Sequence, residues 1–356
     1  MLFIIPTYNR LDRLKWVLKS FFKAIKDIPD VRLCIVNNHP PSVKTVEQVL
    51  SGLKDEKGFP KVEWLVIHRE KTLEPVKSWY SAIVENAREN ETVFLSGDDD
   101  ILLPEGIKAR YDAISEAGAD MLLSRSLRGL WFFPEDRVCL MDLGGVRDTG
   151  LGCELDWSVI DSWGPAFMGN HCYRYTSKFR SALELSYKWC HEQDWLDWNT
   201  RTLMLPYYLP FAVKKTGGLL WGVDRDCVIR GIGAEESSKA KFGVPWNGGF
   251  LALCAYGALC NPDLRDIKGL DVAINSQRKM AADWFLTFFL DSRIDTLSRK
   301  RTLSEFPLGL SVLSPSSLLH GLRLIVLDAT GLRGKAGLRK AKANSIAAED
   351  FLRLLK

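Results

Sequence analysis

The sequence has 356 residues, of which 46% are hydrophobic and 26% charged, and its formal net charge at pH 7 is only +4. This length supplies a large core and about two domains of roughly 150 residues each. The composition excludes intrinsic disorder, collagen-like repetition and a small disulfide scaffold. No apolar stretch reaches the roughly 18 residues of a membrane-spanning helix, and the apolar run after Met1 is too short for a signal peptide. We therefore expect a cytoplasmic protein.

The cysteines and the distribution of charge further limit the kinds of site and partner that the protein could have. No two of the eight cysteines form a Cys-x-x-Cys pair, so we expect reduced, mostly buried thiols rather than a structural zinc site. Residues 321–356 carry eight basic side chains against three acidic ones, which leaves the rest of the chain close to neutral. A nucleic-acid binder would carry its charge over a folded face. We expect no nucleic-acid partner, and a tail that touches something anionic.

The first half of the chain alternates between two periodicities. Five short runs rich in Val, Ile and Leu predict buried strands; they are Leu2–Ile5, Arg32–Val36, Val62–Ile67, Thr92–Leu95 and Asp120–Ser124. Helical spacing lies between them, most clearly from Val76 to Ala87, where Pro75 suits the first turn. The strands recur about every thirty residues, the length of a β-α-β unit. This pattern predicts an α/β protein with a mostly parallel sheet and helices on both faces.

The alternation weakens after about residue 125. Arg128–Phe133 and Arg137–Met141 flank a turn and predict a hairpin. Lys178–Tyr187 has helical spacing, whereas the glycine-rich residues 216–249 favour a mobile loop over a packed element. The patterns beyond residue 250 are helical, so we predict a helical C-terminal region with a basic amphipathic tail at about 250–356.

The strongest chemical feature is the run Asp98–Asp100, which follows a predicted strand and precedes Pro104 at a helix start. Three adjacent carboxylates repel one another unless a cation or hydrogen-bond donors compensate them. Oxygen ligands of this kind favour Mg²⁺ or Mn²⁺, which complete their shells with water and phosphate. The alternative is a solvated turn that caps the next helix. The position at the end of a fourth β-α-β strand, where ligands bind, favours the metal.

Two motifs together resemble family 2 glycosyltransferases. The first is Ile-Ile-Pro-Thr-Tyr-Asn-Arg at residues 4–10, and the second is Leu-Ser-Gly-Asp-Asp-Asp at 95–100, followed by Pro104. Residues 76–83 also look like the helix before the metal motif in bacterial members that build surface polysaccharides. The resemblance covers about residues 1–205 and implies a GT-A fold, Rossmann-like with a mostly parallel central sheet flanked by helices. It also implies inverting transfer of a sugar from a nucleotide-sugar.

This resemblance assigns roles residue by residue. The residues that would border the nucleotide-sugar are Pro6, Thr7, Tyr8, Arg10, Asn38, Asp98 and Asp99. Asn38 departs from the family, which usually has an aspartate that bonds the base at this position. Asp100 would be the principal metal ligand, with Asp98 as a second, and Mn²⁺ or Mg²⁺ would stabilise the charge that develops on the leaving diphosphate.

Inversion requires a base that takes the proton of the acceptor hydroxyl. The family supplies it from an acidic pair, and Gln193-Asp194-Trp195 resembles that element with Gln in place of Glu. We predict Asp194 as the base and Glu192 as the alternative; Asp194 would also suit a helix cap. His171 could contact the acceptor or donor phosphate or be a structural hydrogen-bonding residue. Trp195 could line the site or belong to the core.

Two further segments carry basic residues. Arg225, Arg230 and Lys239 could close over the diphosphate as a lid or be solvated loop charges. Farther on, one helical face is apolar, formed by Leu318, Leu319, Leu322, Ile325 and Val326. Basic side chains follow it at Arg333, Lys335, Arg339, Lys340 and Lys342. Residues 318–356 could therefore dock on an anionic membrane surface, or form an ordinary packed helix with a solvated basic end.

We expect residues 1–249 to form the catalytic domain, with a nucleotide-binding half at about 1–125 and an acceptor half at about 126–249. The expected donor is a UDP-sugar, and the expected acceptor is a glycan or lipid-linked glycan. The chain lacks the Gln-x-x-Arg-Trp motif of processive members, which favours addition of one sugar or a few. One alternative is a sugar-phosphate nucleotidyltransferase, which would need a glycine-rich basic loop after the first strand. The other is a non-catalytic sugar- or nucleotide-binding subunit of a glycan assembly complex.

Overall fold

The structure is a computed structural model of the chain. It describes residues 1–54, 62–124, 129–132, 136–140, 152–155, 169, 171–192, 198–223, 228–232, 262–264 and 344–355, together with scattered positions between 270 and 326. Several predicted residues lie outside this part of the chain: Asp194, Trp195, Arg225, Lys239 and the basic positions from 333 to 342.

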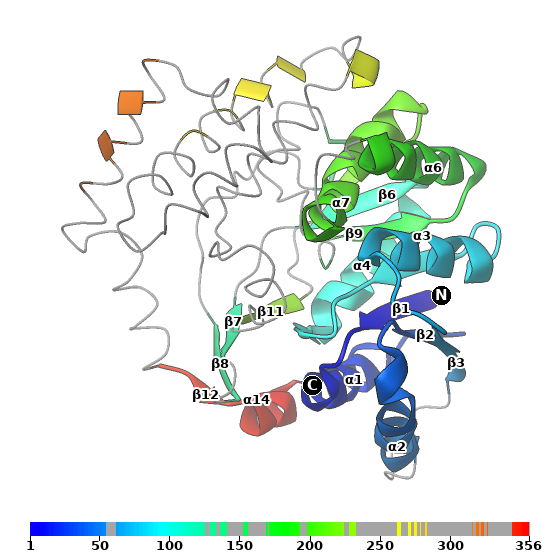
Figure 1. The fold of residues 1–356 in the computed structure, drawn as a ribbon, viewed down its shortest axis with the longest axis vertical. Helices are drawn as coiled ribbons and strands as arrows, with labels where there is room; N and C mark the ends of the chain where they lie inside the picture. Colours follow the sequence, from blue (N-terminus) through cyan, green and yellow to red (C-terminus); the bar gives the residue numbers. More distant parts are fainter. Residues whose placement is uncertain are drawn as a thin grey trace.

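A seven-stranded sheet with helices around it is the largest element of the described residues (Figure 1). Its order is β10-β6-β9-β4-β1-β2-β3. The strands are β1 (Leu2–Thr7), β2 (Arg32–Asn37), β3 (Glu63–His68), β4 (Thr92–Leu95), β6 (Met121–Ser124), β9 (His171–Arg174) and β10 (Leu220–Val223). Neighbours are parallel except at β9, which runs antiparallel to both β4 and β6. The five strands predicted from apolar runs are all confirmed.

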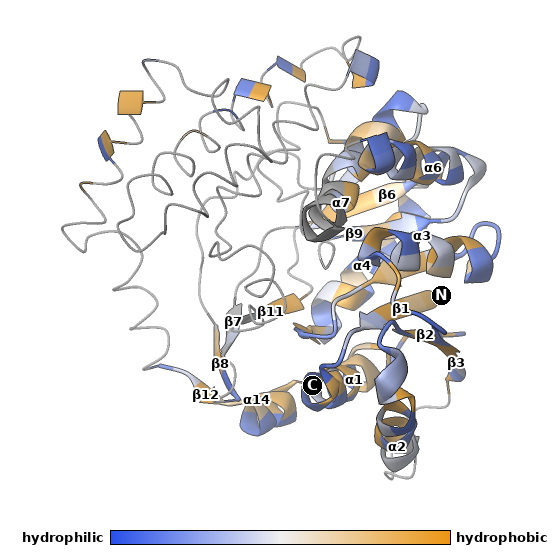
Figure 2. Cartoon of the chain, viewed as in Figure 1, coloured by the Kyte–Doolittle hydropathy of each residue, from blue (hydrophilic) through white to orange (hydrophobic). Residues whose placement is uncertain are grey.

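Helices cover both faces of this sheet. One face packs α1 (Leu11–Ala24), α2 (Val43–Lys54) and α4 (Pro104–Glu116), and the other packs α3 (Pro75–Asn86), α6 (Ser177–Glu192) and α7 (Trp198–Lys215). Because side chains alternate along a strand, Phe3 joins the first core and Ile4 the second, and both are fully buried. Figure 2 shows this apolar interior as orange strands between helices with blue outer faces. The predicted α3 is confirmed, as is a helix over Lys178–Tyr187.

A second sheet lies beside the first, in the order β12-β8-β7-β11-β5. Its strands are β5 (Asp100–Leu102), β7 (Gly129–Phe132), β8 (Arg137–Leu140), β11 (Val228–Ile232) and β12 (Ile346–Ala347). β7 and β8 pair antiparallel and confirm the predicted hairpin. The mobile loop predicted at 216–249 is wrong for 220–223 and 228–232, which form β10 and β11. β10 pairs with β6, and β11 pairs with β5 and β7, all about a hundred residues away, so the local glycine content did not reveal these strands.

The end of the chain returns to the N-terminal half. We refer to Ser345–Leu355, which includes β12 and helix α14 (Ala348–Leu354), as the C-terminal segment. β12 pairs with β8, the Arg137 guanidinium donates to the Ser345 hydroxyl at 2.8 Å, and Lys23 Nζ of α1 donates to the Leu355 carbonyl at 3.1 Å. No helix within the described ranges is long and apolar enough to cross a membrane.

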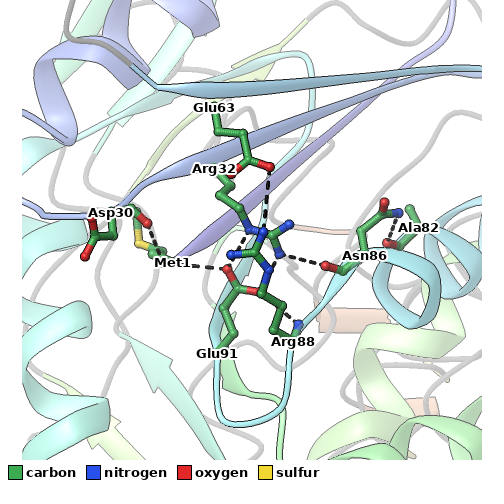
Figure 3. A network of polar contacts seen from close by, with 8 residues as sticks. All are labelled: Met1, Asp30, Arg32, Glu63, Ala82, Asn86, Arg88 and Glu91. Carbon is green, nitrogen blue, oxygen red and sulfur yellow. Dashed lines mark hydrogen bonds and ion pairs between the residues drawn. The ribbon is translucent and has the colours of Figure 1, made fainter.

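A polar network fixes the amino ends of β2 and β4, on the edge opposite the site described below (Figure 3). The Arg32 guanidinium donates to both Glu91 oxygens, at 3.0 and 2.6 Å, and to the Asn86 carbonyl at 2.7 Å. Burial alone would raise the pKa of Glu91. Hydrogen bonds from Arg32 and from the Arg88 backbone outweigh it and lower that pKa below its ordinary value. Glu91 therefore stays ionised and joins the two strands.

Candidate active site

The two predicted motifs, at residues 4–10 and 95–100, meet where the strand order of the large sheet reverses. From β1 the sheet continues through β2 on one side and through β4 on the other. In open α/β sheets ligands bind at the carboxyl ends of the strands at such a point. The segments leaving these ends are Tyr8–Arg10 after β1 and Ser96–Asp99 after β4.

The turn after β1 places one aromatic and one basic side chain at this edge. Asn9 adopts a left-handed backbone with φ of 54°, a conformation that asparagine tolerates better than most residues. Tyr8, just before it, is 45% exposed, whereas Pro6 and Thr7 are buried in β1. The Tyr8 backbone N–H donates to Asp98 Oδ2 at 3.2 Å, which joins the two predicted motifs directly.

Arg10 bridges two carboxylates of the aspartate run. Its Nη1 lies 3.0 Å from Asp98 Oδ1 and 2.9 Å from Asp99 Oδ2. Burial raises the pKa of Asp98, and the charge of Arg10 opposes that rise. Burial would lower the pKa of Arg10, but Asp98 and Asp99 hold that pKa above its ordinary value. Arg10 is thus a fixed cation at the centre of the site.

Gly97 forms a cradle beside two further carboxylate oxygens. A Cβ at Gly97 would lie 2.7 Å from Asp99 Oδ1 and 3.2 Å from Asp100 Oδ2. Both oxygens therefore converge on one small region that a larger residue would fill. Two carboxylates in this arrangement are what Mg²⁺ and Mn²⁺ use when phosphate and water supply the remaining ligands. The donor set fits such an ion bound together with a diphosphate.

The protein offers no complete cage for a metal in the part of the chain that the structure describes. No group of three or more His, Cys, Asp or Glu side chains converges among these residues. A cation at the Gly97 cradle would therefore depend on ligands from outside these side chains.

The second sheet holds the aspartate run in place through contacts of β11 with β5 and with Asp99. β11 pairs antiparallel with β5, with Arg230 opposite Asp100. At Gly231 the two strands approach so closely that a Cβ would lie 2.2 Å from the Asp99 carbonyl oxygen. Sequence reasoning missed Gly231, because glycine is common throughout 216–249 and the contact depends on a distant strand. The backbone of Arg230, predicted as part of a lid, instead belongs to this strand.

The Asn38 side chain hydrogen-bonds to the protein backbone. Its side-chain amide donates to the Leu73 carbonyl at 2.8 Å, and its Oδ1 accepts from the Leu73 N–H at 2.9 Å. It thereby fixes the connection before α3 next to the end of β2. The neighbouring His39 ring meets the Tyr8 ring edge-on, with centroids 5.1 Å apart. A contact between Asn38 and a nucleotide base stays a prediction.

His171 reaches the same edge of the sheet but is fully buried. It begins β9, and its Nδ1 lies 3.0 Å from the Tyr173 hydroxyl. Near it, Arg110 of α4 donates to the Gly169 carbonyl at 2.7 Å and to the Ser124 hydroxyl. Sequence reasoning did not single out Arg110, although a basic residue on the buried stripe of α4 was a visible signal. These contacts tie the end of β6 to the start of β9, and a ligand contact of His171 stays a prediction.

The two candidates for the base lie at the end of α6. Glu192 is the last residue of that helix, is exposed, and lies 3.5 Å from Lys188 Nζ. Asp194 and Trp195 follow it, in the interval before α7 that lies outside the described residues. Both assignments of the base remain predictions.

Comparison with known proteins shows the fold. No family model and no curated protein matches this sequence. Among solved structures, S. aureus TarS 1–349 in complex with UDP-GlcNAc superposes with a TM-score of 0.54 at 13% identity, over 89% of this chain and 82% of that chain. The same protein in complex with UDP gives 0.52 at 14% identity, over 89% and 81%. The chain thus has the mixed α/β architecture of GT-A glycosyltransferases, which confirms the predicted fold class.

Proposed function

We propose that this protein is a glycosyltransferase of the hexosyltransferase type that moves a sugar from a nucleotide-sugar, with a UDP-sugar as the favoured donor. The observation that carries the proposal is the aspartate run held by Arg10 and Tyr8 at the reversal of strand order. The similarity to TarS structures in complex with UDP and UDP-GlcNAc supports this donor class.

In this proposal the donor lies along the carboxyl ends of β1 and β4. The exposed Tyr8 ring offers a face for the base, beside His39. Thr7 and Pro6 shape the floor of this subsite from β1. Asn38 contributes by fixing the chain at Leu73, and Arg10 supplies positive charge toward the diphosphate.

A divalent cation, Mn²⁺ or Mg²⁺, would be held at Asp99 and Asp100, whose oxygens converge over Gly97. The sequence assigned Asp98 as the second ligand. Both oxygens of Asp98 accept hydrogen bonds, Oδ1 from Arg10 and Oδ2 from the Tyr8 backbone, whereas Asp99 binds Arg10 through Oδ2 and turns Oδ1 toward Gly97. We therefore assign this role to Asp99. When bound, such a cation neutralises charge on the leaving nucleoside diphosphate. Arg10 adds a second, permanent positive charge to the same region.

We assign the acceptor side to the residues after α6. Asp194 takes the proton of the acceptor hydroxyl as general base, with Glu192 as the alternative. Attack from the face opposite the diphosphate inverts the anomeric carbon, as in the family 2 enzymes that the two motifs resemble. Trp195 borders the acceptor in this assignment.

The proposed acceptor is a glycan or lipid-linked glycan of surface polysaccharide synthesis, reached at an anionic membrane. Among described positions, Leu318, Leu319, Leu322 and Val326 are exposed and helical, with Leu319 73% exposed. The basic residues between 333 and 342 follow this apolar face in sequence. An apolar face combined with basic charge suits the surface of a bilayer that contains anionic lipids.

The central test is calorimetric binding of UDP, GDP, CMP and dTDP, each with and without Mn²⁺. Wild type should bind one nucleotide with a requirement for Mn²⁺, and Asp100→Ala should lose that requirement together with most of the affinity. Asp112→Ala removes an exposed carboxylate from α4 and should bind as wild type does. If no nucleotide binds under any condition, the nucleotide-sugar assignment is refuted.

A second test separates an enzyme from the non-catalytic binding subunit. Asp194→Asn should abolish turnover, including hydrolysis of the donor, while donor affinity stays within about twofold of wild type. Formation of a nucleotide-sugar from a sugar phosphate would instead identify a nucleotidyltransferase. A wild type that binds donor but never turns it over would favour the binding subunit.

Membrane docking is tested by sedimentation with vesicles of phosphatidylcholine, with and without phosphatidylglycerol. Wild type should sediment with the anionic vesicles only, and Leu319→Ser combined with Val326→Ser should remain in the supernatant. Val84→Ser removes an apolar side chain that is 38% exposed from α3 and serves as the control. Equal sedimentation of all three proteins would contradict the proposed surface.

A further inference from the structure

Arg10 occupies carboxylate oxygens beside the proposed cation cradle. Its Nη1 contacts Asp98 Oδ1 and Asp99 Oδ2, and its side chain is 26% exposed. The other oxygen of Asp99, Oδ1, converges with Asp100 Oδ2 over Gly97. One carboxylate is therefore shared between a permanent cation of the protein and the cradle.

This sharing has opposite consequences with and without a diphosphate. In the free protein, a divalent cation at the cradle would be repelled by the guanidinium on the same carboxylate, because like charges interact strongly at the low effective dielectric of a protein. The negative oxygens of a diphosphate attract both cations, and this attraction outweighs the repulsion between them. The cradle also lacks a third converging acidic, His or Cys side chain among the described residues, so it gains ligands when phosphate arrives.

We infer that Arg10 is an internal counter-ion that makes divalent-cation binding conditional on the nucleotide diphosphate. This inference rests on the proposed function and adds to it an order of events. Arg10 keeps the affinity of the cradle for a divalent cation low until a diphosphate lies beside it. The metal and the nucleotide then bind cooperatively. Arg10 acts here through charge, so lysine at this position should preserve the effect.

The test measures Mn²⁺ dissociation constants from the electron paramagnetic resonance signal of free Mn²⁺, with and without UDP. Wild type should bind Mn²⁺ at least about tenfold more tightly with UDP present. Arg10→Gln should bind Mn²⁺ about tenfold or more tightly than wild type in the absence of UDP, by the loss of Coulomb repulsion. Arg10→Lys should behave as wild type. Lys15→Gln removes the same charge from an exposed position of α1 and should change nothing.

The outcomes separate this inference from the proposed function. Equal Mn²⁺ affinities of wild type and Arg10→Gln without UDP overturn the inference, even when UDP and Mn²⁺ bind together. Circular dichroism establishes that the variant is folded. If Arg10→Gln is not folded, the Mn²⁺ affinity of the wild type is compared with and without UDP. Equal values in these two measurements also overturn the inference. A wild type that binds neither UDP nor Mn²⁺ refutes the proposed function itself.

Discussion

Replacing Gly231 by alanine should damage the protein through one contact. The added Cβ would lie 2.2 Å from the Asp99 carbonyl oxygen, whereas ordinary contacts begin near 3.4 Å. Gly231 does not have a left-handed φ, so the cost is steric rather than conformational. Because the opposing atom belongs to the backbone, no side-chain rotation relieves the clash, and β11 must move away from β5 by about 1 Å.

The expected loss in the free energy of unfolding has two contributions. Overpacking a well-packed contact costs about 1–3 kcal/mol, and weakening the adjacent β5–β11 hydrogen bonding adds about 1 kcal/mol. We therefore expect Gly231→Ala to lower the free energy of unfolding by about 3 kcal/mol. Gly52→Ala is the matched control, because a Cβ there meets nothing within 4 Å. Since Gly52 lies in α2, its replacement should raise stability by about 0.5–1 kcal/mol.

Urea denaturation followed by tryptophan fluorescence measures both variants against wild type. The displaced Asp99 backbone should also weaken binding of UDP with Mn²⁺ in Gly231→Ala, but not in Gly52→Ala. A Gly231→Ala protein within about 0.5 kcal/mol of wild type would refute the reasoning, because the strands would then tolerate a side chain at their closest approach.

Two further predictions separate stability from ligand binding. Gly97→Ala places a methyl group 2.7 Å from Asp99 Oδ1 and 3.2 Å from Asp100 Oδ2. Because both atoms are the ends of side chains, the loss of stability should be smaller than that of Gly231→Ala. Calorimetry in the presence of UDP should show Mn²⁺ binding about tenfold weaker, and unchanged binding would contradict the cradle. Glu91→Gln should cost about 2 kcal/mol at pH 7, since it leaves a half-buried arginine without its carboxylate. Because the native pKa of Glu91 is lowered, its stabilising effect is complete above the unfolded pKa and is lost as pH falls through the native one. Urea denaturation should therefore show a smaller difference in the free energy of unfolding between Glu91→Gln and wild type at pH 4 than at pH 7. As a control, Asp112→Asn breaks an exposed pair and should lower that free energy by less than about 0.5 kcal/mol.

Five of the seven strands of the large sheet were predictable because their apolar residues are adjacent in the sequence. Leu2–Ile5 is the clearest run, since it is apolar over its whole length, as is typical of a strand buried on both faces. The same reasoning failed for β5, which has only three residues and pairs with β11, and for β11, which lies between β5 and β7. Asp100 illustrates the difference: its chemistry was visible in the sequence, but its place at the start of a strand was not.

Side-chain partners were the least predictable part of the site. Sequence reasoning grouped Arg10 with Asp98 and Asp99 around one ligand, but not in direct contact with each other. Asn38 looked like a substitute for a base-binding aspartate, whereas both ends of its amide bind Leu73. Such contacts depend on where loops from different strands cross, and no periodicity in the sequence records that.

The C-terminal segment has a consequence for how the chain folds during synthesis. β8 is complete once residue 140 has emerged from the ribosome, but its outer edge pairs with β12, about two hundred residues later. Until then the nascent chain presents an unpaired strand edge, which is a template for wrong pairing with other chains. Contacts of such long sequence separation also slow folding. Recombinant yield should therefore depend on chaperone supply and on temperature during translation more strongly than the stability of the finished fold suggests.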